Sequence, residues 1–94
     1  MPIRVFPWFA PGDYEAIKSL FPDHPDFPSS YDDWLARAYV QVHAYEELRA
    51  GNVAKPVIVN SAAFLRYLER AGLERSTFSL TSYAVALDEG YAES

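Results

Sequence analysis

The chain has 94 residues, half of them hydrophobic and 16% aromatic, so it carries enough apolar side chains to bury a core and is not expected to be disordered. Its formal charge is −5, with acidic residues spread along the chain and no basic block, which argues against nucleic acid or an anionic membrane as the ordinary ligand. It contains no cysteine, which excludes disulfides, thiol catalysis and thiolate metal ligation. We expect a single globular domain over residues 1–94, because two domains would each be too small to bury a core.

The N-terminal stretch has no continuous apolar run, because Pro7 and Pro11 interrupt it, and it does not read as a signal peptide. No segment approaches the ~20 apolar residues that a membrane-spanning helix needs. We therefore expect a cytoplasmic protein without membrane contact.

The first predicted element is a short strand over residues 3–6, which Pro7 is expected to close. A short helix is predicted over residues 13–21, where Asp13 is a suitable N-cap. Pro22 ends this helix, since the residue before a proline is pushed out of the helical region.

The segment over residues 22–29 contains three prolines and two aspartates, which predicts a stiff ordered loop anchored to the core by Phe27. The longest predicted helix follows, over residues 31–50, with Ser30 as its N-cap and Gly51 just beyond its end. Its apolar side chains recur at intervals of three and four and should form one buried stripe. These are Tyr31, Trp34, Leu35, Ala38, Val42, Tyr45 and Leu48.

The second half of the chain predicts a strand over residues 56–59 and two helices, over residues 61–71 and 77–89. The run that ends at residue 59 is β-branched and apolar, which indicates a buried strand, and its obvious partner is the first strand. The expected fold is α+β and mainly α, with four helices and a small two-stranded element. The side chains expected to point inward are Phe64, Leu65 and Leu68 from the first of these helices, and Leu80, Ala84, Leu87 and Tyr91 from the second.

The loop at residues 22–29 holds the candidate metal ligands Asp23, His24 and Asp26, to which His43 could add a second imidazole. This spacing matches no site of worked-out geometry, and prolines and aspartates are also what tight turns select. A metal-binding or hydrolytic enzyme centred on this loop is therefore one alternative. The main expectation is a protein without catalytic activity or cofactor.

A second alternative is a small DNA-binding regulator that uses a helix-turn-helix-like pair at residues 61–89. A DNA-recognition helix should present Arg, Lys, Asn or Gln to base edges and phosphates, yet residues 79–87 contain none of them. Two ordinary core helices joined at Gly72 are the simpler explanation.

The apolar arc of the helix at residues 31–50 is wider than one packing seam requires, and the chain holds seven tyrosines. Tyrosine is enriched at interfaces because it combines apolar area with a polar tip, although the rim of a core selects the same residue. We predict a non-catalytic protein-interaction or assembly module that binds a protein partner or associates with itself as a homodimer. The predicted interaction surface is formed by Tyr39, Val40, His43, Tyr45 and Tyr67.

Residues 25–35, PDFPSSYDDWL, and the stretch from PVIVN at residues 56–60 to residue 73 resemble an uncharacterised family of small bacterial proteins. The resemblance implies a bacterial cytosolic protein. It implies no activity.

Overall fold

The computed structural model describes residues 2–92 of the chain. In chain order the elements are β1 (Ile3–Trp8), the 3-10 turn η1 (Pro11–Asp13), α1 (Tyr14–Ser19), α2 (Tyr31–Leu48), β2 (Val53–Ile58), α3 (Ser61–Ala71) and α4 (Thr77–Glu89). The predicted α+β, mainly α fold is confirmed. The first helix is shorter than the predicted span of residues 13–21, because residues 11–13 form the tighter 3-10 turn instead.

The two strands form a parallel pair, in register from Ile3 opposite Val53 to Trp8 opposite Ile58. Parallel strands need a long crossover, and here α1 and α2 supply it. Both strands have six residues and differ from the predicted ranges of residues 3–6 and 56–59.

Pro7 lies within β1, so the prediction that it closes the strand is wrong. The amide of Val59 donates to the carbonyl oxygen of Trp8 at 2.8 Å, which fixes the alternation of bonds in the ladder. Alternate residues of each strand bond to the other strand, so the Val59–Trp8 bond fixes which residues face inward. By this alternation the nitrogens of Pro7 and Pro56 both face the outer edges of the sheet. No N–H is needed there, which is why a strand tolerates proline at these positions.

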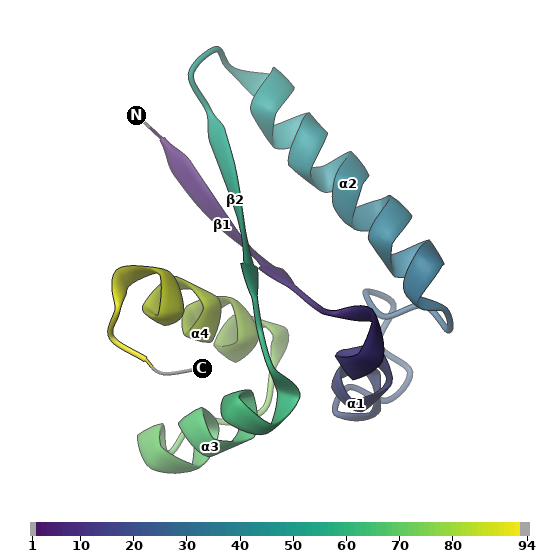
Figure 1. Ribbon diagram of the computed structural model, residues 1–94, viewed down its shortest axis with the longest axis vertical. Helices are drawn as coiled ribbons and strands as arrows, with labels where there is room; N and C mark the ends of the chain where they lie inside the picture. The colour runs from purple at the N-terminus through teal and green to yellow at the C-terminus, as the bar shows by residue number, and fades with distance from the viewer. Residues whose placement is uncertain (1, 93–94) are drawn as a thin grey trace.

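Helices cover the two faces of the sheet, as Figure 1 shows with the strands running between α2 and α4. On one face, the ring centroid of Trp8 lies 5.2 Å from that of Trp34 in α2. On the other face, Lys55 of β2 forms an ion pair with Asp88 of α4. Ile58, on the α2 face of β2, is 57% exposed, so α2 leaves the carboxyl end of β2 uncovered.

The core lies at the carboxyl ends of the strands, where α1, α3 and the loop at residues 22–29 meet. Its members include Phe9, Tyr14, Ile17, Phe21, Phe27, Trp34, Val59, Phe64, Leu68, Leu80 and Tyr83. The predicted anchoring role of Phe27 is confirmed. The prediction of a buried second strand is wrong, because only Val59, one residue beyond β2, is fully buried. The prediction fails because the α2 face of β2 is left largely uncovered.

The long helix begins as predicted, with the side chain of Ser30 accepting from the amide of Asp33 at 3.1 Å. It ends at Leu48, two residues before the predicted end at residue 50. There the side-chain amide of Asn52 donates to the carbonyl oxygen of Tyr45 at 2.9 Å and satisfies part of the last turn. Leu48 is 78% exposed, so the predicted buried stripe stops short of the helix end.

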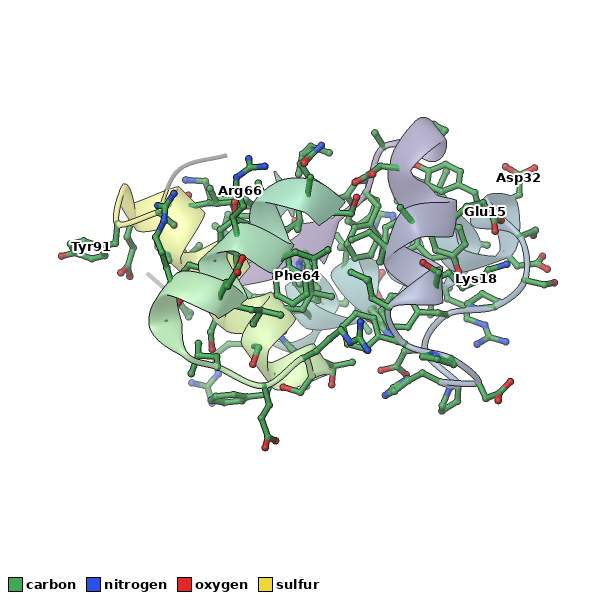
Figure 2. The ribbon with its side chains drawn as sticks, turned by 90° about the horizontal axis from the view of Figure 1, so that it is seen from below. Glu15, Lys18, Asp32, Phe64, Arg66 and Tyr91 are labelled. Carbon is green, nitrogen blue, oxygen red and sulfur yellow. The ribbon has the colours of Figure 1, made fainter. Side chains whose placement is uncertain are left out.

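The last two helices have the predicted bounds. Asn60 caps α3 by accepting from the amide of Ala63, and Gly72 ends it in the left-handed region at φ 65°. Leu65 and Tyr91 were expected to point inward, but both are exposed. Figure 2 shows the contrast between Phe64 in the middle of the molecule and Tyr91 projecting from one end.

Asp13 does not cap α1, contrary to the prediction. Its carboxylate instead accepts from the backbone amide of Ser61 at 2.7 Å and from the Ser61 hydroxyl at 2.6 Å. Parallel strands end at the same edge of a sheet, so the segments that follow β1 and β2 begin side by side. The carboxylate therefore joins the start of α1 to the start of α3.

Burial raises the pKa of the Tyr14 hydroxyl, and the neighbouring Glu15 charge raises it further. Burial likewise raises the pKa of Tyr83. The neutral phenol is favoured in the folded chain, while the unfolded chain ionises near pH 10. The free energy of unfolding should therefore be unaffected by these groups below about pH 10 and fall as the pH rises through the folded pKa values.

Tyr14→Phe should make this alkaline loss of stability shallower. It should also cost about 1 kcal/mol at pH 7, because the Tyr14 hydroxyl donates to the Pro28 carbonyl oxygen at 2.6 Å. Urea denaturation from neutral to strongly alkaline pH measures both effects. If the free energy of unfolding of Tyr14→Phe fell with rising alkaline pH as steeply as that of the unsubstituted chain, Tyr14 would not be a source of the alkaline loss of stability.

Candidate functional site

A groove of about 920 Å³ runs along β1 between α2 and α4. Its floor is residues 4–9, and its walls come from residues 34–48 of α2 and residues 77–81 of α4. No lining residue comes from β2, while side chains from both faces of β1 contribute. The groove therefore follows the outer edge of β1, the edge that does not pair with β2.

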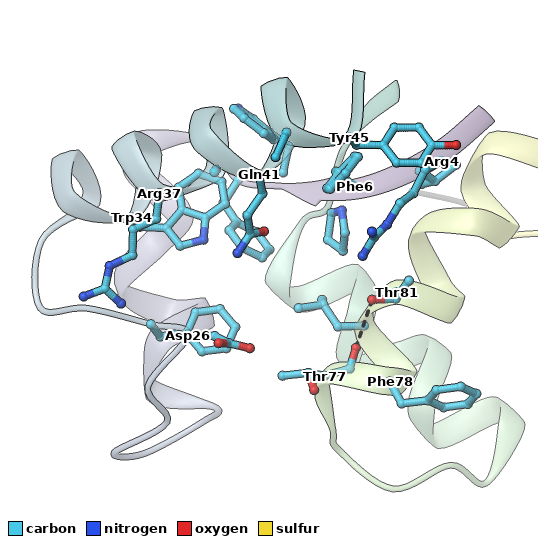
Figure 3. Close-up of a pocket in the computed structure, with 18 of the residues that line it drawn as sticks. Arg4, Phe6, Asp26, Trp34, Arg37, Gln41, Tyr45, Thr77, Phe78 and Thr81 are labelled. Atoms are coloured by element: carbon cyan, nitrogen blue, oxygen red, sulfur yellow. Dashed lines mark hydrogen bonds between the residues drawn. The ribbon is translucent and has the colours of Figure 1, made fainter. Parts of the chain in front are cut away.

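The wall from α2 follows the helical repeat. Trp34 and Ala38 lie buried at its base, and Gln41, Tyr45 and Leu48 continue the same side of the helix at spacings of three and four. Figure 3 shows Gln41 projecting into the space between the two helices. The wall is thus closed and aromatic at one end and increasingly solvent-exposed toward the other.

The wall from α4 is formed by two threonines and two large apolar side chains. The Thr81 hydroxyl donates to the Thr77 carbonyl oxygen at 3.2 Å (Figure 3). Leu80 lines the same wall and is buried in the core. Phe78 belongs to the same wall and is 80% exposed. A large apolar side chain this exposed gains from being covered.

Arg4 gives one end of the groove a positive charge. Its guanidinium carbon lies 4.9 Å from the ring centroid of Phe6 and 5.9 Å from that of Tyr45, so it is held by cation–π contacts. Within residues 2–92 no carboxylate forms an ion pair with it. An arginine without an acidic partner is available to an incoming anionic group.

The other end of the groove carries Arg37 and Asp26. The Arg37 guanidinium donates to the Pro25 carbonyl oxygen at 3.0 Å, which ties α2 to the preceding loop. Two arginines and one aspartate leave the groove locally positive in a chain whose formal charge is −5. Asp26 is the only carboxylate among the described lining residues, and its Oδ2 lies 3.8 Å from Nδ1 of His24 in the same loop.

The candidate metal ligands of the loop do not converge. The amide of Asp26 donates to Nδ1 of His24 at 3.1 Å, and the imidazole packs edge-on against Phe21 and Phe27. Asp23 occupies the left-handed region at φ 58°, as a turn residue can. Across residues 2–92 no three His, Asp or Glu side chains are placed to hold a metal ion together.

The predicted interaction residues divide into two groups. Tyr39, Val40 and His43 are exposed on α2, and Tyr45 lies half-buried in the groove wall. Tyr67 lies apart on α3, where it lines a separate depression of about 350 Å³. Sequence reasoning missed the groove residues on β1 and α4, since no local pattern links positions so far apart in the chain.

The helix pair α3 and α4 packs as part of the core. α4 buries Leu80, Tyr83 and Ala84, and its residues 77–89 contain no Arg or Lys to contact a phosphate. No observation favours the DNA-binding alternative.

The fold and the groove define a small α+β domain whose two-stranded parallel sheet has an open edge between two helices. Comparison of the chain with protein-family models, curated proteins and solved structures finds no match. The resemblance to a family of small bacterial proteins stays a prediction. Over residues 2–92 no helix combines the length and apolarity needed to cross a bilayer.

Proposed function

We propose that this chain is a non-catalytic protein-interaction module that binds its partner in the groove between α2 and α4. The observation that carries the proposal is the incomplete burial of α2. Only Trp34 and Ala38 are buried in this 18-residue helix, and its second half borders the 920 Å³ groove. In proteins most helical stability comes from packing, so a long helix with an uncovered half is suited to a partner.

Exposed apolar side chains on both walls support the same proposal. Leu48 on α2 and Phe78 on α4 are 78% and 80% exposed and line the one groove. Burial of apolar area contributes about 25 cal/mol per Å², so covering both walls with a single partner favours binding. Exposed Tyr39 and Val40 lie on the same helix and can extend the contact area.

Capture from a lysate of the native host with two matched variants of α2 tests the proposal. Ala44 lines the groove and Ala36 does not, and both alanines are exposed on α2. Arginine is a good helix former, so both substitutions should leave the fold intact. We expect a stoichiometric protein to be retained by the unsubstituted chain and by Ala36→Arg, and lost with Ala44→Arg.

Self-association is the alternative within this proposal, and sedimentation of the purified chain measures it. A dimer that Ala44→Arg dissociates would make the second copy the partner. A strictly monomeric chain that retains no protein, or that retains the same proteins with Ala44→Arg, would contradict the proposal.

A further inference from the structure

The outer edge of β1 has backbone groups without a strand partner. The amide of Val59 bonds to the carbonyl oxygen of Trp8, so the even residues of β1 face β2 and the odd residues face the groove. Val5 therefore directs its N–H and C=O into the groove, and Pro7 presents only its C=O there. Ile3 directs its N–H and C=O to the same outer edge, just beyond the groove. Within residues 2–92 no side chain or loop backbone bonds to these groups.

We propose that the groove binds an extended segment of another protein, which adds to the sheet as a third strand beside β1. This inference rests on the proposed function and names the form in which the partner is recognised. Strand addition supplies affinity through main-chain hydrogen bonds and specificity through alternate side chains.

The two helices already form the walls that a third strand needs. A new strand would lie about 4.8 Å from β1, and α2 and α4 border the groove on opposite faces of the sheet. Trp8 and Phe6 pack on α2 from β1, whereas Ile58 of β2 stays exposed on that face. α2 borders the empty position beside β1, where it would cover one face of the new strand.

A second copy of this chain does not fit the same position. Pairing β1 with β1 of another copy would bring the α2 helix of that copy to the edge that the first α2 already borders, whereas packed helices need about 8–10 Å between their axes. The same conflict arises between the two α4 helices on the other face. A single segment without flanking helices avoids both conflicts, so the occupant is a strand from a different protein.

The groove also determines the chemistry of the segment. Side chains on one face of the added strand would meet the aromatic wall of Trp34 and Tyr45, and those on the other face would meet Leu80 and Thr81. Arg4, without an acidic partner among the described residues, favours an Asp or Glu at that end. We therefore expect alternating apolar residues flanked by an acidic one, over about the six-residue length of β1.

The outer edge of β2 does not offer an equivalent site. Pro56 removes a donor from its middle, and residues of β2 line neither groove nor depression in the part of the chain that the structure describes. On β1, Pro7 lies nearer the end of the strand and leaves the Ile3 and Val5 amides free to pair.

Selection of a phage-displayed library of random peptides on the purified chain tests the proposal. Soluble copies of the selected peptides are then titrated against the unsubstituted chain, Ala44→Arg and Ala36→Arg. We expect peptides with alternating apolar residues and an acidic end, whose binding weakens at least tenfold with Ala44→Arg and is unchanged with Ala36→Arg. N-methylation of alternate peptide amides should weaken binding by about three- to tenfold, and methylation of the intervening amides should not.

Two results would overturn the proposal in different ways. The first result is a set of peptides with apolar residues at helical spacing, whose binding is weakened by Ala44→Arg but does not depend on which alternate amides are methylated. This result would exclude strand addition and leave the groove as an interaction site. The second result is peptide binding that Ala44→Arg does not weaken, or no enrichment of peptides on the folded protein. This result would contradict both strand addition and the proposal that the groove is an interaction site.

Discussion

Phe64→Ala should destabilise the chain by about 3–5 kcal/mol, the cost of truncating a fully buried phenylalanine. Phe64 has no solvent exposure, and its ring centroid lies 5.9 Å from that of Tyr83 and 6.4 Å from that of Phe21. The residue joins α3 to α4 and to the segment after α1, so few neighbours can collapse into the cavity. A chain of this length is expected to be stable by about 5–14 kcal/mol, so the variant should be close to unfolding at 37 °C. Urea denaturation followed by circular dichroism measures the change.

Leu65→Ala is the matched control. Leu65 is the next residue of α3 and is 41% exposed, so its truncation should cost less than about 1 kcal/mol. If both variants lost similar stability, the orientation of α3 in the core would be wrong.

Asp13→Ala should cost about 2–3 kcal/mol, because it removes a partly buried carboxylate that accepts two hydrogen bonds from Ser61. Bonds to an ionised acceptor are stronger than neutral ones, and the 2.6 and 2.7 Å distances are short. The same carboxylate lies at the N-terminus of α3, where negative charge is favourable. Thermal and urea unfolding of the variant measure the loss.

A double-mutant cycle with Ser61→Ala isolates this contact. Ser61→Ala removes the hydroxyl donor and keeps the amide donor, so it should cost less than Asp13→Ala. The two losses should not add, since both variants remove the same hydroxyl bond. Strict additivity would mean that the carboxylate and the hydroxyl do not interact in solution.

The start of α2 and both ends of α3 and α4 were predictable because their signals are local. Ser30 and Asn60 each accept from the backbone amide three residues on, and Gly72 takes the left-handed conformation that ends α3. The bounds of α4 follow in the same way from its capping serine, Ser76. Such caps depend on residues within one turn of each other, which a sequence shows directly.

Strand limits and burial depended on tertiary neighbours. Pro7 is compatible with β1 only because its nitrogen faces the outer edge, and the sequence does not show which edge a residue faces. The role of Asp13 was also misassigned, since its partner Ser61 lies 48 residues away. Leu48 fits the helical repeat of buried positions but borders the open groove and is 78% exposed.

The groove itself was not predictable from local patterns. Arg4, Gln41 and Thr81 belong to three elements that meet only because the strands are parallel and α4 packs on β1. The apolar excess of α2 and the abundance of tyrosine predicted an interaction surface, and of the residues assigned to it Tyr45 lines the groove. The proposed mode of binding depends on the direction of the β1 amides, which only the three-dimensional structure provides.

Amide hydrogen exchange of β1, measured by NMR with and without a selected peptide, tests strand addition most directly. In the free chain the Val5 amide should exchange quickly and the Phe6 amide slowly, because only Phe6 faces β2. Saturating peptide should slow exchange at Val5 by at least about tenfold and leave Phe6 protected as before. An unchanged Val5 amide in the saturated complex would contradict the pairing of a partner strand with β1.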